Sequence, residues 1–169
     1  MTELLQRILP TVQKPARYTG GEFNEIKKNP KDVRVRVAFC FPDTYEIGMS
    51  NVGMRILYGI MNEMDGVWCE RVYAPWPDME EKMRKFNIPL FALESKDAIK
   101  DFDIIATGDL GQEGLELGKE YAKSLGLILG SNYVDCGMLI YDLKTQEVGA
   151  GGSGCGCSAS VFAAEIYPK

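Results

Sequence analysis

The chain has 169 residues, which is long enough for one domain with a substantial core or for two small units. Its formal net charge of −5 argues against nucleic-acid binding, and the absence of histidine excludes His-based metal sites and Ser–His or Cys–His nucleophile pairs. No apolar run reaches the roughly 18 residues of a membrane span, and the first residues lack a signal-peptide pattern, so the sequence predicts a cytoplasmic protein without a membrane span.

Four strands are predicted in the first part of the chain, from alternating or continuous apolar runs. They lie at residues 33–41, 67–73, 88–93 and 102–106.

Helices are predicted before and between these strands. A short amphipathic helix ends before Pro10, a second begins at about Ser50, and a third begins at Pro77, because proline suits the first helical position. The residues predicted to face the core are Met54, Leu57, Met61 and Met64 on the second helix and Met79, Met83 and Phe86 on the third. The alternation predicts an α/β protein with a Rossmann-like αβα layered fold and a mainly parallel sheet.

The loop at residues 42–48 follows the first predicted strand and is the candidate ligand site, because ligands bind beyond the carboxyl ends of parallel strands. The candidate cofactor-binding residues in it are Asp43, Tyr45, Glu46 and Gly48. The alternative is that this loop only turns the chain, with Asp43 as a cap and Gly48 supplying a permissive backbone.

Long motifs in the first part of the chain point to a known family. Residues 17–22 (Arg-Tyr-Thr-Gly-Gly-Glu), 39–50 and 69–80, continued by residues 88–95, resemble the N-terminal region of a radical SAM family with a cobalamin-binding-like domain. The resemblance covers residues 1–105 and implies a Rossmann-like domain with cobalamin as its candidate cofactor.

The residues required for that family's chemistry are not all present. The cysteines lie at positions 40, 69, 136, 155 and 157, so no C-x3-C-x2-C motif exists, and neither an iron–sulfur cluster nor S-adenosylmethionine is predicted in this chain. Domains that ligate cobalt use a D-x-H-x-x-G loop, whereas this sequence offers residues 43–48 and no histidine. A cobalamin without a protein ligand to cobalt and a domain that lost the cofactor both remain open.

Charge and glycine content change near residue 103. Residues 1–102 carry 15 Lys/Arg and 15 Asp/Glu, whereas residues 103–169 carry 4 and 9, with 12 of the 18 glycines. The change predicts one region at 1–102 and a second at 103–169.

The second region is predicted to hold a glycine turn at residues 107–111, a helix that closes near Gly126, a strand within 132–142 and a final helix through Tyr167. A glycine turn before a helix can hold an anion, but this spacing matches no phosphate-binding motif, and a structural turn is favoured. The pair Cys155 and Cys157, even with Cys136, supplies fewer than the four ligands of tetrahedral zinc, so buried thiols and no metal site are predicted.

Residues 107–111, 132–137 and 151–159 resemble the stage V sporulation protein AD family. The resemblance covers residues 103–169 and implies part of a thiolase-like fold and a role in dipicolinic acid uptake into the forming spore. Asp109, Gly152, Ser153, Cys155 and Cys157 are then the alternative ligand-binding residues. The half that carries the nucleophilic cysteine in thiolase relatives is absent, so these two cysteines are not predicted nucleophiles.

Two functions follow, and no catalytic residue is assigned for either. The first is a non-catalytic accessory or ligand-binding α/β domain of radical SAM type, and the alternative is a sporulation-type fragment that takes part in dipicolinic acid uptake. A third interpretation is a recombined chain that binds neither ligand. The predicted partners are a small molecule and, through surfaces that incomplete domains leave open, another protein or a second copy.

Overall fold

The computed structural model describes residues 2–108, 110–124, 128–135, 142 and 145–146. The chain divides into two compact units, Met1–Asp103 and Ile104–Lys169. Each unit contains a pair of parallel strands joined through a helix, so the predicted α/β class with parallel strands is confirmed. No helix in the described part of the chain is long and apolar enough to cross a membrane.

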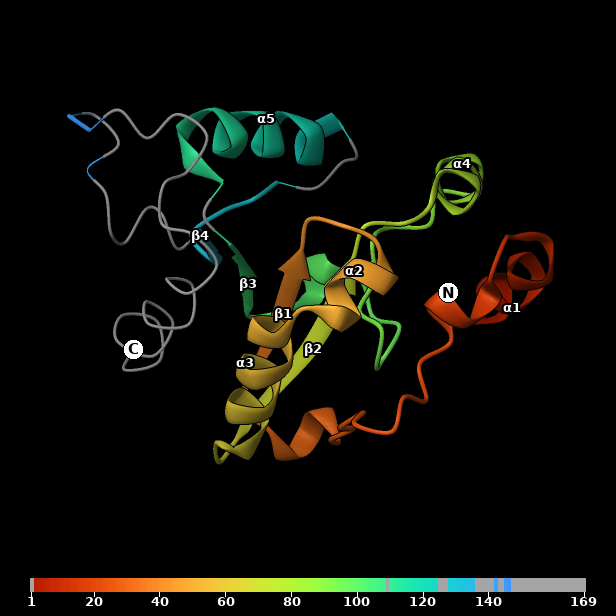
Figure 1. The fold of residues 1–169 in the computed structure, drawn as a ribbon, viewed down its shortest axis with the longest axis horizontal. Coiled ribbons are helices and arrows are strands. Elements are labelled where there is room, and N and C mark those ends of the chain that lie inside the picture. Colours follow the sequence, from red (N-terminus) through yellow and green to blue (C-terminus); the bar gives the residue numbers. More distant parts are fainter. Residues whose placement is uncertain (1, 109, 125–127, 136–141, 143–144, 147–169) are drawn as a thin grey trace. The chain divides into compact units, whose positions relative to one another are not determined.

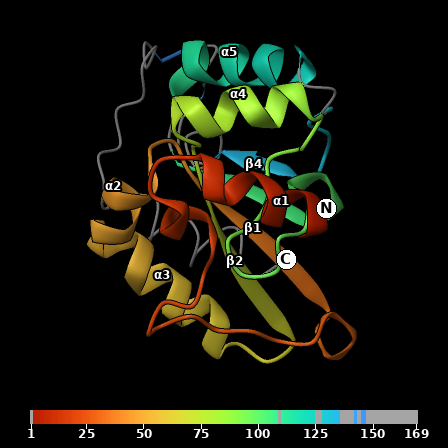
Figure 2. The same cartoon turned by 90° about the vertical axis from the view of Figure 1, so that its right-hand side faces the viewer.

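The first unit is built on strands β1 (Val35–Phe41) and β2 (Val67–Tyr73). They pair in parallel over their whole length, from Val35 opposite Val67 to Phe41 opposite Tyr73. The helices between them, α2 (Tyr45–Ser50) and α3 (Val52–Glu63), lie on one face of this pair (Figures 1 and 2). The result is a β–α–β unit of the kind that Rossmann-like folds repeat.

Helix α3 packs on the strands through one face. The buried side chains of that face are Met54, Leu57, Tyr58 and Met61. Three of these were predicted from helical spacing, and the prediction is confirmed for them, whereas Met64 is the residue that ends the helix. The side-chain oxygen of Asn51 accepts the N–H of Met54 at 2.9 Å and so caps the start of α3.

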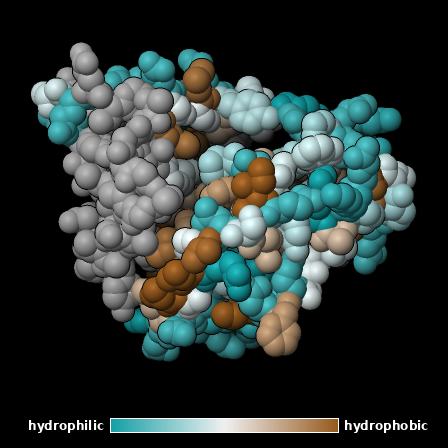
Figure 3. Space-filling model, viewed as in Figure 1, coloured by the Kyte–Doolittle hydropathy of each residue, from teal (hydrophilic) through white to brown (hydrophobic). Residues whose placement is uncertain are grey.

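The outer face of α3 carries a row of exposed apolar side chains. Val52, Ile56 and Ile60 are spaced four residues apart and are 65%, 54% and 47% exposed. Ile47 on α2 is also exposed, and apolar side chains over these helices are visible in Figure 3.

A second hydrophobic cluster joins helices α1 (Thr2–Ile8) and α4 (Pro77–Lys85), which lie side by side in Figure 2. Its buried members are Leu5, Ile8, Val12, Tyr18, Met79, Met83, Ile88 and Phe91. The predicted start of α4 at Pro77 and the burial of Met79 and Met83 are confirmed. The predicted burial of Phe86 is wrong: this residue ends the helix and is 43% exposed.

Residues 88–93 do not form the predicted strand. Phe91 makes a single antiparallel bridge with Ala98, and the chain between them turns back on itself. The N–H of Ala92 therefore binds the carbonyl of Asp97 at 3.0 Å, and the N–H of Leu93 binds the carbonyl of Arg71 at 2.7 Å. These bonds use backbone groups that a longer strand would need, and the bond to Arg71 places Leu93 beside the outer edge of β2.

The predicted loop at 42–48 is also shorter than expected, because α2 begins at Tyr45. The first helical bond runs from the N–H of Gly48 to the carbonyl of Thr44 at 3.0 Å. A six-residue helix that contains glycine and serine has little intrinsic propensity, so no helix was predicted for these residues.

The second unit holds β3 (Ile104–Thr107), α5 (Gly111–Ser124) and β4 (Tyr133–Asp135). The strands pair in parallel, with Thr107 opposite Asp135. The buried carboxylate of Asp135 accepts the hydroxyl of Thr107 at 2.8 Å and the N–H of Leu110 at 3.2 Å. This carboxylate therefore joins the end of β3 to the residue before α5. The predicted final helix lies outside the described residues.

Candidate functional site: a pocket at the carboxyl ends of β1 and β2

A pocket of about 20 Å³ lies in the first unit where β1 and β2 end. Thr44 and Tyr45 line it from the segment after β1, and residues 73–76 line it from the end of β2. Its other walls are Arg17, Tyr18, Arg71, Met83, Leu90, Phe91 and Leu93. The pocket therefore stands where parallel α/β sheets bind their ligands.

Arg17 is one of the two buried cations that line this pocket. It lies in the 3-10 turn Pro15–Tyr18 and is only 8% exposed. Its Nε–H donates to Glu46 Oε1 at 2.8 Å, and its guanidinium lies 4.5 Å from the centre of the Trp76 ring. The hydrogen bond from Arg17 lowers the pKa of Glu46, so this carboxylate is ionised at neutral pH.

One nitrogen of Arg17 is not used by these contacts. Its Nη1 atom is buried and has no hydrogen-bond partner among the described residues. A buried cationic donor without a partner is costly, since burial removes its hydration and nothing replaces it.

Two tyrosines form another wall of the pocket. The rings of Tyr45 and Tyr73 meet edge to face, with their centroids 5.8 Å apart. The hydroxyl of Tyr45 donates to Glu22 Oε1 at 3.0 Å, and that of Tyr73 donates to Met49 Sδ at 3.1 Å. Burial raises the pKa of Tyr45 to about 12 and raises that of Tyr73 as well, so both hydroxyls are neutral.

Arg71 lies beneath the pocket and is fully engaged in ion pairs. Its Nε is 2.6 Å from Glu94 Oε1, its Nη2 is 3.2 Å from Glu22 Oε2, and its backbone N–H donates to the other oxygen of Glu94 at 2.7 Å. The side chains of Arg71 and Glu94 are 3% and 0% exposed. With two carboxylates beside it, Arg71 has no charge to offer a ligand.

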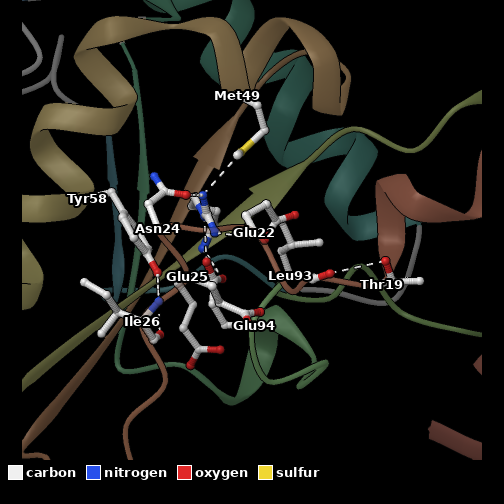
Figure 4. Close-up of polar contacts among 12 residues, drawn as sticks. Thr19, Glu22, Asn24, Glu25, Ile26, Met49, Tyr58, Leu93 and Glu94 are labelled. Atoms are coloured by element: carbon white, nitrogen blue, oxygen red, sulfur yellow. Dashed lines mark hydrogen bonds and ion pairs between the residues drawn. The ribbon is translucent and has the colours of Figure 1, made fainter.

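Neutral groups complete the surroundings of the Arg71 guanidinium. Its Nη1 lies 3.4 Å from Asn24 Oδ1 and 3.2 Å from Met49 Sδ, and its centre lies 4.4 Å from the Tyr58 ring. Figure 4 shows Asn24, Met49 and Tyr58 converging here with Glu22 and Glu94. The side chain of Arg71, on β2, thus contacts residues from distant parts of the sequence.

The four residues predicted from the sequence at this end of the sheet have different positions. Tyr45 lines the pocket, and Glu46 holds Arg17. Asp43 is not among the lining residues; its carboxylate accepts the N–H of Thr44 at 2.6 Å. Gly48 packs against the ring of Tyr73, which a Cβ atom at this position would overlap.

Sequence reasoning missed Arg17, Tyr73 and Trp76 as pocket residues. Arg17 and Trp76 belong to motifs that carried the family resemblance, and this was their only signal. Their contact joins residues 59 positions apart, and no local pattern predicts such a pair.

The pocket does not fit the cofactors that the radical SAM resemblance implies. A site for even a drug-sized ligand has a volume of about 300–1,000 Å³, whereas this pocket has about 20 Å³ and no histidine to bind cobalt. Cys40 and Cys69 are protonated thiols, as their pKa values indicate, and no group of three metal-binding side chains occurs among the described residues. The alternative ligand-binding residues Asp109, Gly152, Ser153, Cys155 and Cys157 all lie outside the described residues.

The thiols of Cys69, which is buried, and of Cys40, which is partly buried, are expected to react slowly. Burial raises the pKa of Cys40 to about 12 and raises that of Cys69 well above its usual value. We expect iodoacetamide at pH 8 to modify Cys40 about 1,000-fold more slowly in the folded chain than in urea, because the thiolate is the reactive form, and to modify Cys69 more slowly as well. Peptide mass spectrometry measures each site separately, and equal rates in the two states would contradict their burial.

Comparison with known proteins gives two partial matches. The family model for stage V sporulation protein AD matches residues 88–169, and the model for the N-terminal part of radical SAM proteins matches residues 53–108. Both resemblances predicted from the sequence are therefore confirmed, and the two matches share residues 88–108. Residues 1–52 lie outside both matches.

One curated relative is the stage V sporulation protein AD of Bacillus subtilis (strain 168), which is 46% identical over 69 residues. The match covers 41% of this chain and 20% of the relative, so the chain spans about a fifth of that protein's length. No solved structure matches the chain significantly.

Proposed function

We propose that the first unit is a non-catalytic accessory domain of radical SAM type that binds a small ligand at the carboxyl ends of β1 and β2. The observation that carries this proposal is the pocket lined by Arg17, Tyr45 and Trp76 at this end of the sheet. The match to the N-terminal part of radical SAM proteins supports the same family context.

The chemistry of the described residues supports a binding role rather than catalysis. The buried thiols are protonated, the tyrosines are neutral, and Arg71 is held between two carboxylates. A general acid or base needs a pKa near the working pH, and none of these groups meets that condition.

The ligand site can be located by NMR of the full chain with a mixture of small fragments of different charge. We expect the shifted signals to cluster at Tyr45, Tyr73 and Trp76, because these residues line the pocket. Shifts confined to other parts of the chain, or none with any fragment, would contradict the proposal.

Hydroxocobalamin is a control for a large ligand. After dialysis of the protein with this compound, we expect the protein fraction to show no visible absorbance from bound cobalamin.

A second candidate function concerns the other end of the chain. The 46% identity with stage V sporulation protein AD over 69 residues supports a sporulation-type segment that takes part in dipicolinic acid uptake. Residues 88–108, which both family models match, include β3, the first strand of the second unit. We propose that the two families meet at this strand.

Titration calorimetry with dipicolinate tests the second function. Saturable heat that persists in an Arg17→Gln variant would support a site outside the pocket of the first unit. No heat, or heat that this variant abolishes, would count against the second function.

A further inference from the structure

We infer that the pocket at the carboxyl ends of β1 and β2 is a carboxylate subsite, in which the free Nη1 of Arg17 is the anchoring donor. This inference rests on the proposed ligand-binding role of the first unit and specifies the chemical class of the ligand.

The unpaired nitrogen of Arg17 is the first observation. A guanidinium has five N–H donors, and here Glu46 engages Nε while Nη1 remains without a partner among the described residues. Glu46 binds the Nε side of the guanidinium at 2.8 Å. Nη1 has almost no accessible surface, so a ligand oxygen reaches it only when the side chains that cover it shift, and it then satisfies this donor through a charge-assisted bond.

The side chain is also held in place before any ligand arrives. Arg17 is 92% buried, packs on the Trp76 ring at 4.5 Å and is fixed by its bond to Glu46. Lys14, which precedes the turn Pro15–Tyr18, has a left-handed backbone with φ of 49°, and its Nζ approaches the same carboxylate at 3.2 Å. A fixed guanidinium loses little further entropy when it binds a ligand.

The charge of the site favours a singly charged anion. A volume of about 20 Å³ takes one oxygen of the anion, and a single guanidinium matches the one charge of a carboxylate better than the higher charge of a phosphate. The other pocket cation, Arg71, is already paired with Glu22 and Glu94, so the subsite has a single positive group to offer.

The aromatic walls of the pocket favour a ring in the uncharged part of the ligand. Beside Arg17 the pocket presents the rings of Tyr45 and Trp76, and Trp76 is 38% exposed. Aromatic surfaces favour a flat apolar group, so a carboxylate attached to a ring matches both parts of the site.

Benzoate is the probe, and benzamide, which has the same ring without the charge, is its control. The chain has two tryptophans, and the indole N–H of Trp68 is already bound to the carbonyl of Ile26 at 3.1 Å. In NMR titrations of the full chain, we expect benzoate to shift the indole signal of Trp76 and to leave that of Trp68 in place. We expect benzamide to bind at least about tenfold more weakly, because a charged hydrogen bond is worth roughly 1.5–3 kcal/mol.

Two variants test the assignment to Arg17. Arg17→Gln should weaken benzoate about tenfold or more and leave benzamide unchanged. Lys14→Gln, which removes the exposed cation beside the same Glu46, should change benzoate affinity less than about twofold, because solvent screens that charge.

Each alternative outcome is decisive. If benzoate and benzamide bind the pocket equally, the carboxylate inference fails while the ligand-binding role stands. Tighter binding of inorganic phosphate than of benzoate at the Trp76 signal also overturns it. If no fragment reaches the pocket, the proposed function itself fails. The wild-type comparison of benzoate with benzamide keeps the test valid even if Arg17→Gln disturbs local packing.

Discussion

An Arg71→Gln variant is expected to lose about 3–5 kcal/mol of unfolding free energy, because it leaves the buried carboxylate of Glu94 without its counter-ion. Glu94 is fully buried, and Glu22 loses the ion pair at its Oε2 atom in the same change. Urea unfolding followed by circular dichroism measures the loss as a lower midpoint at an unchanged slope.

Arg84→Gln is the matched control. Arg84 also pairs with a glutamate, Glu80, at 2.6 Å, but these side chains are 47% and 38% exposed and lie one helical turn apart. Such pairs are worth roughly 0.3–0.5 kcal/mol, so the control should barely move the midpoint. A similar loss in both variants would mean that the burial of Arg71 and Glu94 carries no energetic weight.

The loss of unfolding free energy in the Arg71→Gln variant should also depend on pH. Burial raises the pKa of Glu94, and Arg71 opposes this rise. Without Arg71 the folded chain takes up a proton at Glu94 at a higher pH than the unfolded chain does, so acidification favours the folded state. We therefore expect the difference between variant and wild type to narrow as the pH falls from 7 toward 5. A difference that widens would assign the loss to another group.

Gly48→Ala is expected to destabilise the first unit by about 1–3 kcal/mol, although alanine is normally the better helix former. Gly48 lies inside α2, and a Cβ atom there would overlap the ring of Tyr73. That ring has little room to move, because it packs against Tyr45 and donates its hydroxyl to Met49. Since Tyr73 lines the pocket, benzoate binding should weaken in the same variant.

Gly59→Ala provides the opposite case. Gly59 lies inside α3, and a Cβ atom there meets nothing within 4 Å. This substitution should stabilise the chain by about 0.5–1 kcal/mol through helix propensity alone. Thermal unfolding of both variants compares the two effects directly, and equal shifts would show that the contact between Gly48 and Tyr73 does not limit packing.

Periodicity predicted the regular elements well, because they are determined by local side-chain patterns. The strand at 67–73 has the predicted boundaries and the next helix begins at Pro77 as predicted, although the strand contains two charged residues, Glu70 and Arg71. Their charges are satisfied on opposite faces, by Arg36 for Glu70 and by Glu94 for Arg71. Those partners lie 23 or more residues away, so the strand was predictable but its ion pairs were not.

The candidate site was predictable only in its location. The rule that ligands bind beyond the carboxyl ends of parallel strands led to residues 42–48, and Tyr45 does line the pocket. Arg17 lies before the first strand and enters the site through Trp76 and Glu46, two contacts that exist only after folding. A sequence pattern records spacing along the chain, and it contains no signal for a cation that returns from outside the sheet.

The bond from Leu93 to the carbonyl of Arg71 has a consequence for solubility. A strand at the border of a sheet exposes unpaired backbone groups that can recruit strands from other molecules and start aggregation. Residues 91–98 lie along that border of β2 and close on themselves through Phe91 and Ala98. The folded chain therefore shields β2 from intermolecular pairing, and changes that loosen this turn should promote fibril formation before they abolish folding.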